Sequence, residues 1–241
     1  MLTLPFFWAT ILFLLIFFAT LKIFKLQIGF KHEHHVLPLV RKTIVPLIAF
    51  VGLVLIVDLF HEVGHALGGT AMGGRVLRMQ IAYFEVYPEL KITPNFVLGA
   101  IWIEGLDGFS LGLFKLGGSM TTNIISWFLT LILQKMQLGS KTRIGLRIMW
   151  FLGLLDLPFY VIFPQIGLHH WIFWGGEQPE PLIGARLMGV SDSIFYIMVI
   201  LSTVGLSLGY IKYLIEQRKN INAQIMSMNM FKKLFLATSV Q

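Results

Sequence analysis

Five long apolar segments constrain the fold of this chain more than any other feature. Each has about the length that a helix needs to cross the hydrocarbon layer of a bilayer, roughly 20 residues. They cover residues 4–24, 44–67, 108–133, 145–166 and 193–215. Hydrophobic residues make up 56% of the 241 residues and charged residues only 13%, a composition typical of membrane proteins rather than soluble domains. The sequence therefore predicts an all-α, multi-pass integral membrane protein with about five transmembrane helices in one domain, residues 1–241.

The first apolar segment is predicted to be a retained membrane anchor. No basic residue precedes it, it is longer than the apolar part of a secretory signal, and Lys22 and Lys25 lie at and just beyond its end. The formal net charge of +7 comes from basic residues that gather at the ends of the apolar segments. That pattern favours contact with a membrane surface over binding of nucleic acid.

The distribution of Lys and Arg also predicts an orientation. Basic residues are concentrated between the first and second segments, between the third and fourth, and after the fifth. By the positive-inside rule these three regions face the cytoplasm, and the N-terminus lies on the other side. Arg75, Arg78 and Lys91 would then lie on the side opposite the cytoplasm, against that rule.

The second apolar segment ends in a motif with the spacing of a metal site, His61-Glu62-Val63-Gly64-His65. Histidines four residues apart share one face of a helix, so both imidazoles can bind one zinc ion. Glu62 lies beside that face and can act as a general base toward an attacking water. Ionisable groups inside an apolar span are costly and are therefore usually functional.

A catalytic zinc ion usually has three protein ligands, so a further ligand is needed. The chain has no cysteine, which leaves imidazole and carboxylate. We predict Asp156, the only carboxylate of the fourth apolar segment, with Pro158 nearby to bend the helix. Asp156 paired with a basic side chain or capping a broken helix is the structural alternative. Other carboxylates that remain candidates are Asp107, Glu104, Glu177 and Glu180.

Several other polar residues have both a functional and a structural interpretation. Asn123, in the third apolar segment, is a candidate donor to a developing oxyanion or a hydrogen-bonding residue between helices. Asp58 lies three residues before His61 and is a candidate partner of a metal ligand. Two further histidine clusters are expected to be solvated or interfacial rather than metal-binding; they comprise His32, His34 and His35 beside Glu33, and His169 with His170.

The segments between the apolar spans have distinct patterns. After Gly73-Gly74, residues 75–90 contain short stretches in which the residue types alternate, which predicts a β-hairpin or small sheet. Residues 93–116 fit neither a clean helix nor a clean strand. Residues 168–190 carry Trp171 and Trp174 and are predicted to form an interfacial cap. The basic tail, residues 216–241, is predicted to be a helix lying on anionic lipid.

Three motifs together resemble the site-2 protease family of intramembrane zinc metalloproteases. They are HEVGHALGG at 61–69 with GGRV at 73–76, GGSMTTN at 117–123, and LLDLP at 154–158. The resemblance covers a core of about residues 44–166. It implies a three-helix metalloprotease core and hydrolysis of peptide bonds in or next to transmembrane segments of membrane proteins.

The resemblance also implies roles for individual residues. His61, His65 and Asp156 would hold Zn²⁺, Glu62 would be the catalytic base, and Asn123 would be the core asparagine of the family. The hairpin at 75–90 would be membrane-associated and would add an extended substrate as a strand. The expected partners are a membrane protein or peptide substrate, the lipid bilayer and a regulatory membrane protein, but no nucleic acid.

Two other functions remain open from the residues alone. One is a zinc protease of the His-His-Glu type that acts on loops at the membrane surface. The other is a non-catalytic, metal-binding membrane scaffold that retains the fold.

Overall fold

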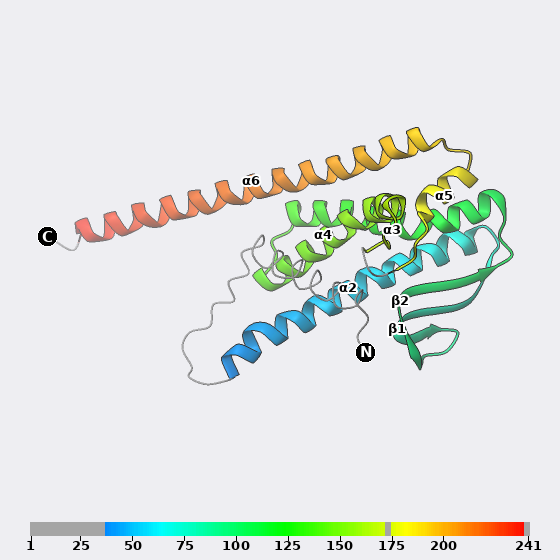
Figure 1. Cartoon of the computed structure of the whole chain (residues 1–241). Coiled ribbons are helices and arrows are strands. Elements are labelled where there is room, and N and C mark those ends of the chain that lie inside the picture. The colour runs from blue at the N-terminus through cyan, green and yellow to red at the C-terminus, as the bar shows by residue number, and fades with distance from the viewer. Residues whose placement is uncertain (1–36, 172–174, 239–241) are drawn as a thin grey trace.

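Four helices long and apolar enough to cross a membrane form most of the structure, a computed structural model that describes residues 37–171 and 175–238. The helices are α2 (Leu37–Ala71), α3 (Gly108–Lys135), α4 (Ser140–Ile162) and α6 (Asp192–Thr238) (Figure 1). They confirm the second to fifth predicted apolar segments and indicate a membrane protein. The first predicted segment, 4–24, and the histidine cluster at 32–35 lie outside the described residues.

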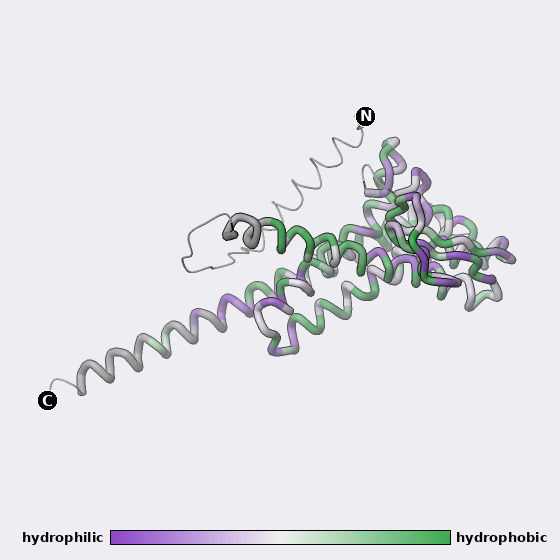
Figure 2. The backbone as a smooth tube through the Cα atoms, turned by 90° about the horizontal axis from the view of Figure 1, so that it is seen from below, coloured by the Kyte–Doolittle hydropathy of each residue, from purple (hydrophilic) through white to green (hydrophobic). Residues whose placement is uncertain are grey.

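Helix α3 lies at the centre of the arrangement and packs against α2, α4 and α6. A buried apolar cluster between α3, α4 and α6 includes Leu129, Trp150 and Tyr210. The rings of Trp150 and Tyr210 stack with their centroids 4.1 Å apart. The outer faces of the helices carry exposed apolar side chains, such as Leu201 and Leu208 of α6. Figure 2 shows this distribution, with hydrophobic residues along the helices and more hydrophilic residues at the end that carries the hairpin.

Helices α2 and α3 touch through their backbones where two glycines meet. A Cβ atom at Gly64 would overlap the carbonyl oxygen of Gly117, and a Cβ atom at Gly117 would lie 2.5 Å from the carbonyl oxygen of Gly64. Small residues allow such close approach of membrane helices. The crossing brings the HEVGH motif of α2 directly against the GGSMTTN stretch of α3.

A two-stranded antiparallel sheet follows α2 and consists of β1 (Arg75–Tyr87) and β2 (Lys91–Glu104). The prediction of a hairpin is confirmed, but its predicted extent, 75–90, is wrong because that segment contains little more than β1. All but the first two residues of β2 lie in the part of the chain, 93–116, for which no structure was predicted. Its run of apolar residues from Phe96 to Ile103, interrupted by Gly99 and Ala100, lacks the period of two that identifies a half-buried strand.

Polar side chains hold the hairpin together. The amide nitrogen of Gln80, with two hydrogens to donate, lies 2.7–3.0 Å from three acceptors, the Ala82 carbonyl, Thr93 Oγ1 and the Asn95 carbonyl. Glu85 forms ion pairs with Lys91 and Arg78 at 2.8 and 2.7 Å, and the hydrogen bond from Lys91 lowers the pKa of this carboxyl. Arg75 pairs with Glu104 at 2.6 Å. Arg75, Arg78 and Lys91 of the hairpin are therefore each paired with a carboxylate.

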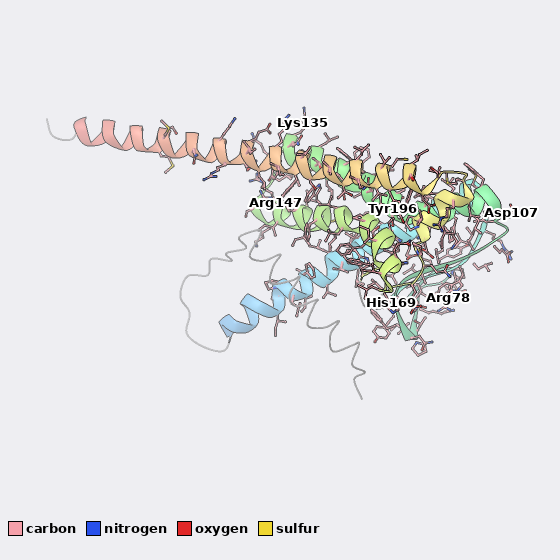
Figure 3. All side chains as sticks on the ribbon, turned by 45° about the horizontal axis from the view of Figure 1, so that its top comes forward. Arg78, Asp107, Lys135, Arg147, His169 and Tyr196 are labelled. Atoms are coloured by element: carbon pink, nitrogen blue, oxygen red, sulfur yellow. The ribbon has the colours of Figure 1, made fainter. Side chains whose placement is uncertain are left out.

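The predicted cap, residues 168–190, contains the short helix α5 (Glu180–Leu187) and follows the 3-10 helix η1 (Phe163–Ile166). Leu182 and Ala185 of α5 are fully buried in a cluster with Leu157 of α4 and Phe195 of α6. In Figure 3 the labelled His169 of the cap lies toward the same end of the molecule as Arg78 of the hairpin, and Lys135 and Arg147 lie toward the other end.

The C-terminal tail is helical but is not a separate helix lying beside the bundle. Residues 216–238 continue α6 without a break, and in Figure 1 this part of α6 projects beyond α3 and α4. The predicted helix in the tail is confirmed, and its contact with anionic lipid stays a prediction. It continues α6 because no glycine or proline follows Gly209 within α6, so nothing in the sequence stops the helix at the end of the apolar segment.

The close crossing of α2 and α3 can be tested with Gly64→Ala. The added methyl group would overlap the Gly117 backbone, and overpacking of this kind typically costs about 1–3 kcal/mol. We expect a lower melting temperature in detergent. Gly52→Ala is the control, because a Cβ atom there meets nothing within 4 Å on the same helix. Equal melting temperatures for the two variants would contradict the crossing.

Candidate metal centre

The two histidines of the HEVGH motif point their Nε2 atoms at each other. These atoms lie 3.0 Å apart, and His61 and His65 are only 2% and 4% exposed. The spacing of four residues places the rings one above the other on α2, with centroids 4.8 Å apart. Two ligands of one tetrahedral zinc ion lie about 3.3 Å apart, given Zn–N distances near 2.0–2.1 Å. The pair is therefore spaced to share one ion.

The Nδ1 atoms of the two rings identify which nitrogens are available. His65 Nδ1 lies 2.6 Å from the Phe114 carbonyl oxygen, and His61 Nδ1 lies 2.9 Å from Asp156 Oδ2. Both oxygens can accept hydrogen bonds, and with a proton on each Nδ1 the lone pairs of both Nε2 atoms are available to a metal ion. The same two Nε2 atoms, 3.0 Å apart, are also within hydrogen-bond distance of each other. The chemistry of this donor pair fits a divalent metal ion.

Gly118 of α3 makes room for the pair. A Cβ atom at this position would overlap the Nε2 atoms of both His61 and His65. The second glycine of the GGSMTTN stretch therefore lets the two Nε2 atoms lie directly against the α3 backbone.

Asp156 of α4 lies beside His61, but at its Nδ1 atom rather than at the Nε2 atom that faces His65. Its Oδ2 atom accepts hydrogen bonds from His61 Nδ1 at 2.9 Å and from Thr122 Oγ1 of α3 at 2.6 Å, and Asp156 is 2% exposed. This is the position of a carboxylate that orients a metal-binding imidazole. Within the described ranges, no group of three His, Asp or Glu side chains is placed to hold a metal ion. Direct ligation by Asp156 stays a prediction.

The other carboxylates considered from the sequence differ in their surroundings. Asp107 is exposed and forms a capping box with Ser110 at the start of α3, Glu104 pairs with Arg75, and Glu177 lies 3.5 Å from His169 Nε2. Glu180, the first residue of α5, is different: its Oε2 atom lies 3.8 Å from Nε2 of His65. Of these four candidates, Glu180 is the one that borders the paired nitrogens.

Glu62 is buried between α2 and the hairpin. It is 5% exposed, and a Cβ atom at Gly99 of β2 would lie 2.5 Å from Glu62 Oε1 and 2.6 Å from Asp58 Oδ2. The backbone of β2 thus covers both carboxylates. Asp58 is 8% exposed and lies beside Glu62 rather than at either Nδ1 atom of the histidines.

Asn123 faces α6. Its Oδ1 atom accepts a hydrogen bond from Ser202 Oγ at 2.8 Å, and Ser202 Oγ in turn lies 3.3 Å from Trp127 Nε1. The neighbouring Thr122 is the α3 residue that binds Asp156. The described contacts place Asn123 in a link between helices, and its catalytic role stays a prediction.

Aromatic rings from the cap side cover His61, and the sequence did not predict them. Tyr160 of α4 packs on His61 with ring centroids 4.6 Å apart, and His170 packs on Tyr160 at 3.8 Å. His170 is 2% exposed, and burial lowers its pKa. Of the expected solvated or interfacial states, the solvated one is wrong for His170. Its burial depends on Gly175, Gly176 and the Gln178 carbonyl around the ring, a local arrangement with no sequence signature.

No protein-family model, curated protein or solved structure matches this chain. The resemblance to the site-2 protease family therefore depends on the short sequence motifs alone.

Gly118→Ala tests whether the imidazole pair binds metal where it faces α3. The methyl group would displace both Nε2 atoms, so we expect the purified variant to lose most of its zinc, as measured by elemental analysis. The control is Gly145→Ala in α4, where a Cβ atom meets nothing within 4 Å. Full zinc occupancy in Gly118→Ala would be incompatible with this site.

Proposed function

We propose that this chain is a multi-pass, intramembrane zinc metalloprotease that hydrolyses peptide bonds in or next to transmembrane segments. The observation that carries the proposal is the pair of Nε2 atoms 3.0 Å apart on His61 and His65, with the buried Glu62 next to His61 in the chain. Chance placement of these three groups is disfavoured because they lie in an apolar helix, Ile44–Ala71, where ionisable residues are costly.

The proposed centre would use residues from three helices. His61 and His65 of α2 would hold the zinc ion together with a carboxylate, which the family resemblance assigns to Asp156 of α4. When bound, the metal would supply Lewis-acid polarisation of the peptide carbonyl. Asp156 and the Phe114 carbonyl fix the tautomer of the two imidazoles through their Nδ1 atoms.

Glu62 is the proposed general base. Its carboxylate would accept a proton from the attacking water and deliver it to the leaving amine. The position of Glu62 against Gly99 supports this role, because a substrate that lies along the hairpin would pass close to the base.

The hairpin is the proposed substrate guide. A peptide bond inside a helix is protected by internal hydrogen bonds, so a transmembrane substrate must unwind locally before cleavage. A two-stranded sheet has two outer edges with unpaired backbone groups, and an unwound segment can add there as a strand. This is the substrate mode that the family resemblance implies.

A zinc protease of the His-His-Glu type is the second candidate, and the proximity of Glu180 to His65 favours it. It would act on loops at the membrane surface rather than on unwound transmembrane segments. Cleavage of a soluble loop peptide, without cleavage of a reconstituted transmembrane substrate, would support this second candidate.

Glu62→Gln tests the proposed base. We expect the zinc content to persist and peptide hydrolysis to fall by about 10²–10⁴-fold, the usual contribution of general acid–base catalysis. The assay is cleavage of a transmembrane substrate in proteoliposomes. Glu216→Gln is the control, since Glu216 is exposed on α6. Undiminished cleavage by Glu62→Gln would eliminate Glu62 as the base.

Asp156→Asn tests the role of the buried carboxylate. Loss of its charge weakens the bond to His61 Nδ1 and any direct bond to the metal, so we expect zinc affinity to fall by at least about 10–100-fold, the loss typical of partners of metal ligands. Competition with a chelator measures the affinity. A much larger loss would identify Asp156 as a direct ligand, whereas an unchanged affinity would contradict any role for it at the centre.

A further inference from the structure

We propose that Arg143 and Arg147 of α4 form a binding site for the phosphate group of an anionic phospholipid. The site lies between α4 and α6, at the end of the helices opposite to the hairpin, where Figure 3 shows Arg147 and Lys135. The inference does not depend on the metal centre or on proteolysis, because it concerns other residues at the other end of the molecule.

The first argument is that the basic residues at this end have no carboxylate partner. Residues 134–147 and 212–219 contain seven basic residues and one acidic residue, Glu216. None of the seven forms an ion pair with any carboxylate within residues 37–171 and 175–238. In the hairpin, by contrast, every Lys and Arg is paired with a glutamate. The negative charge that balances this end therefore comes from outside the described chain.

The second argument is where this charge lies relative to a membrane. Three of the segments that are long and apolar enough to span one, Gly108–Lys135, Ser140–Ile166 and Asp192–Lys219, begin or end here. The headgroups of a bilayer lie at the ends of its spanning helices. By the positive-inside rule this end is expected to face the cytoplasm, where the leaflet contains anionic lipid.

The third argument is the geometry of the two arginines. They are four residues apart on α4, so they share one face of that helix, and both reach α6. Arg143 Nη1 donates to Gln217 Oε1 at 3.3 Å, and Arg147 Nη2 donates to Tyr213 Oη at 2.7 Å. Gln217 and Tyr213 are also four residues apart. Two guanidinium groups are thus held side by side, one turn apart, in the seam between the two helices.

The fourth argument is that neutral groups fix both guanidinium groups without balancing their charge. The Cζ atom of Arg147 lies 5.1 Å from the centroid of the Tyr213 ring, and Tyr213 is 1% exposed. Arg143 Nη2 donates to the Leu138 carbonyl at 3.0 Å. Each guanidinium retains N–H donors that no described residue accepts, including the buried Nε of Arg147. The planar fork of arginine matches the oxygens of a phosphate, so a phosphodiester supplies both the acceptors and the charge.

The test measures lipid binding to the purified full chain in nanodiscs of phosphatidylcholine and phosphatidylglycerol in equal parts. Native mass spectrometry gives the relative affinity for the two lipids. We expect the double variant Arg143→Gln with Arg147→Gln to lower the preference for phosphatidylglycerol by about 25-fold, because each basic residue near an anionic surface contributes about fivefold in affinity.

The matched control is the double variant Arg75→Gln with Lys91→Gln. It removes the same charge from the hairpin, where both residues already pair with carboxylates, so the preference should stay at its wild-type value. An unchanged preference in the Arg143 and Arg147 variant, or an equal loss in this control, would overturn the inference.

A further double variant, Arg143→Lys with Arg147→Lys, separates charge from packing. It keeps both positive charges and should retain most of the preference for phosphatidylglycerol. A loss as large as that of the glutamine variant would overturn the inference, because disturbed packing between α4 and α6 would then explain both results. Inorganic phosphate that abolishes the preference of the wild-type protein would identify a site for free anions and would also contradict a lipid site.

Discussion

The contact between the backbones of α2 and α3 at Gly64 and Gly117 is the constraint on which the candidate centre depends. It brings α2 so close to α3 that the imidazoles of His61 and His65 lie against Gly118 and reach the carbonyl of Phe114. A larger residue at any of these glycines would separate the two helices. The motif HEVGH thus acquires its geometry from the small residues of a second helix.

The buried carboxylate of Asp156 shows how an apolar helix can contain an ionisable group. Asp156 binds His61 and Thr122, so its charge is matched by donors from two other helices. An unpaired carboxylate in such surroundings would be costly. The Nε2 atoms of the two histidines face each other 3.0 Å apart, and this is where the proposed metal ion would bind.

Much of the fold could be predicted from the sequence because apolar length determines where membrane helices form. The HEVGH spacing also predicted the facing imidazoles. The extent of β2 could not be predicted, since an apolar run without alternation fits several structures. The position of Asp156 at Nδ1 rather than Nε2, the burial of His170 and the proximity of Glu180 depend on contacts between distant segments, which sequence spacing does not encode.

The most direct test of the account is X-ray absorption at the zinc edge, measured on the purified full-length protein in detergent. The account predicts one zinc ion per chain whose first shell contains two imidazole nitrogens and carboxylate oxygen, with the imidazole signal lost in a variant that lacks His61 and His65. A protein that binds no zinc, or one whose zinc spectrum is unchanged when both histidines are replaced, would contradict it.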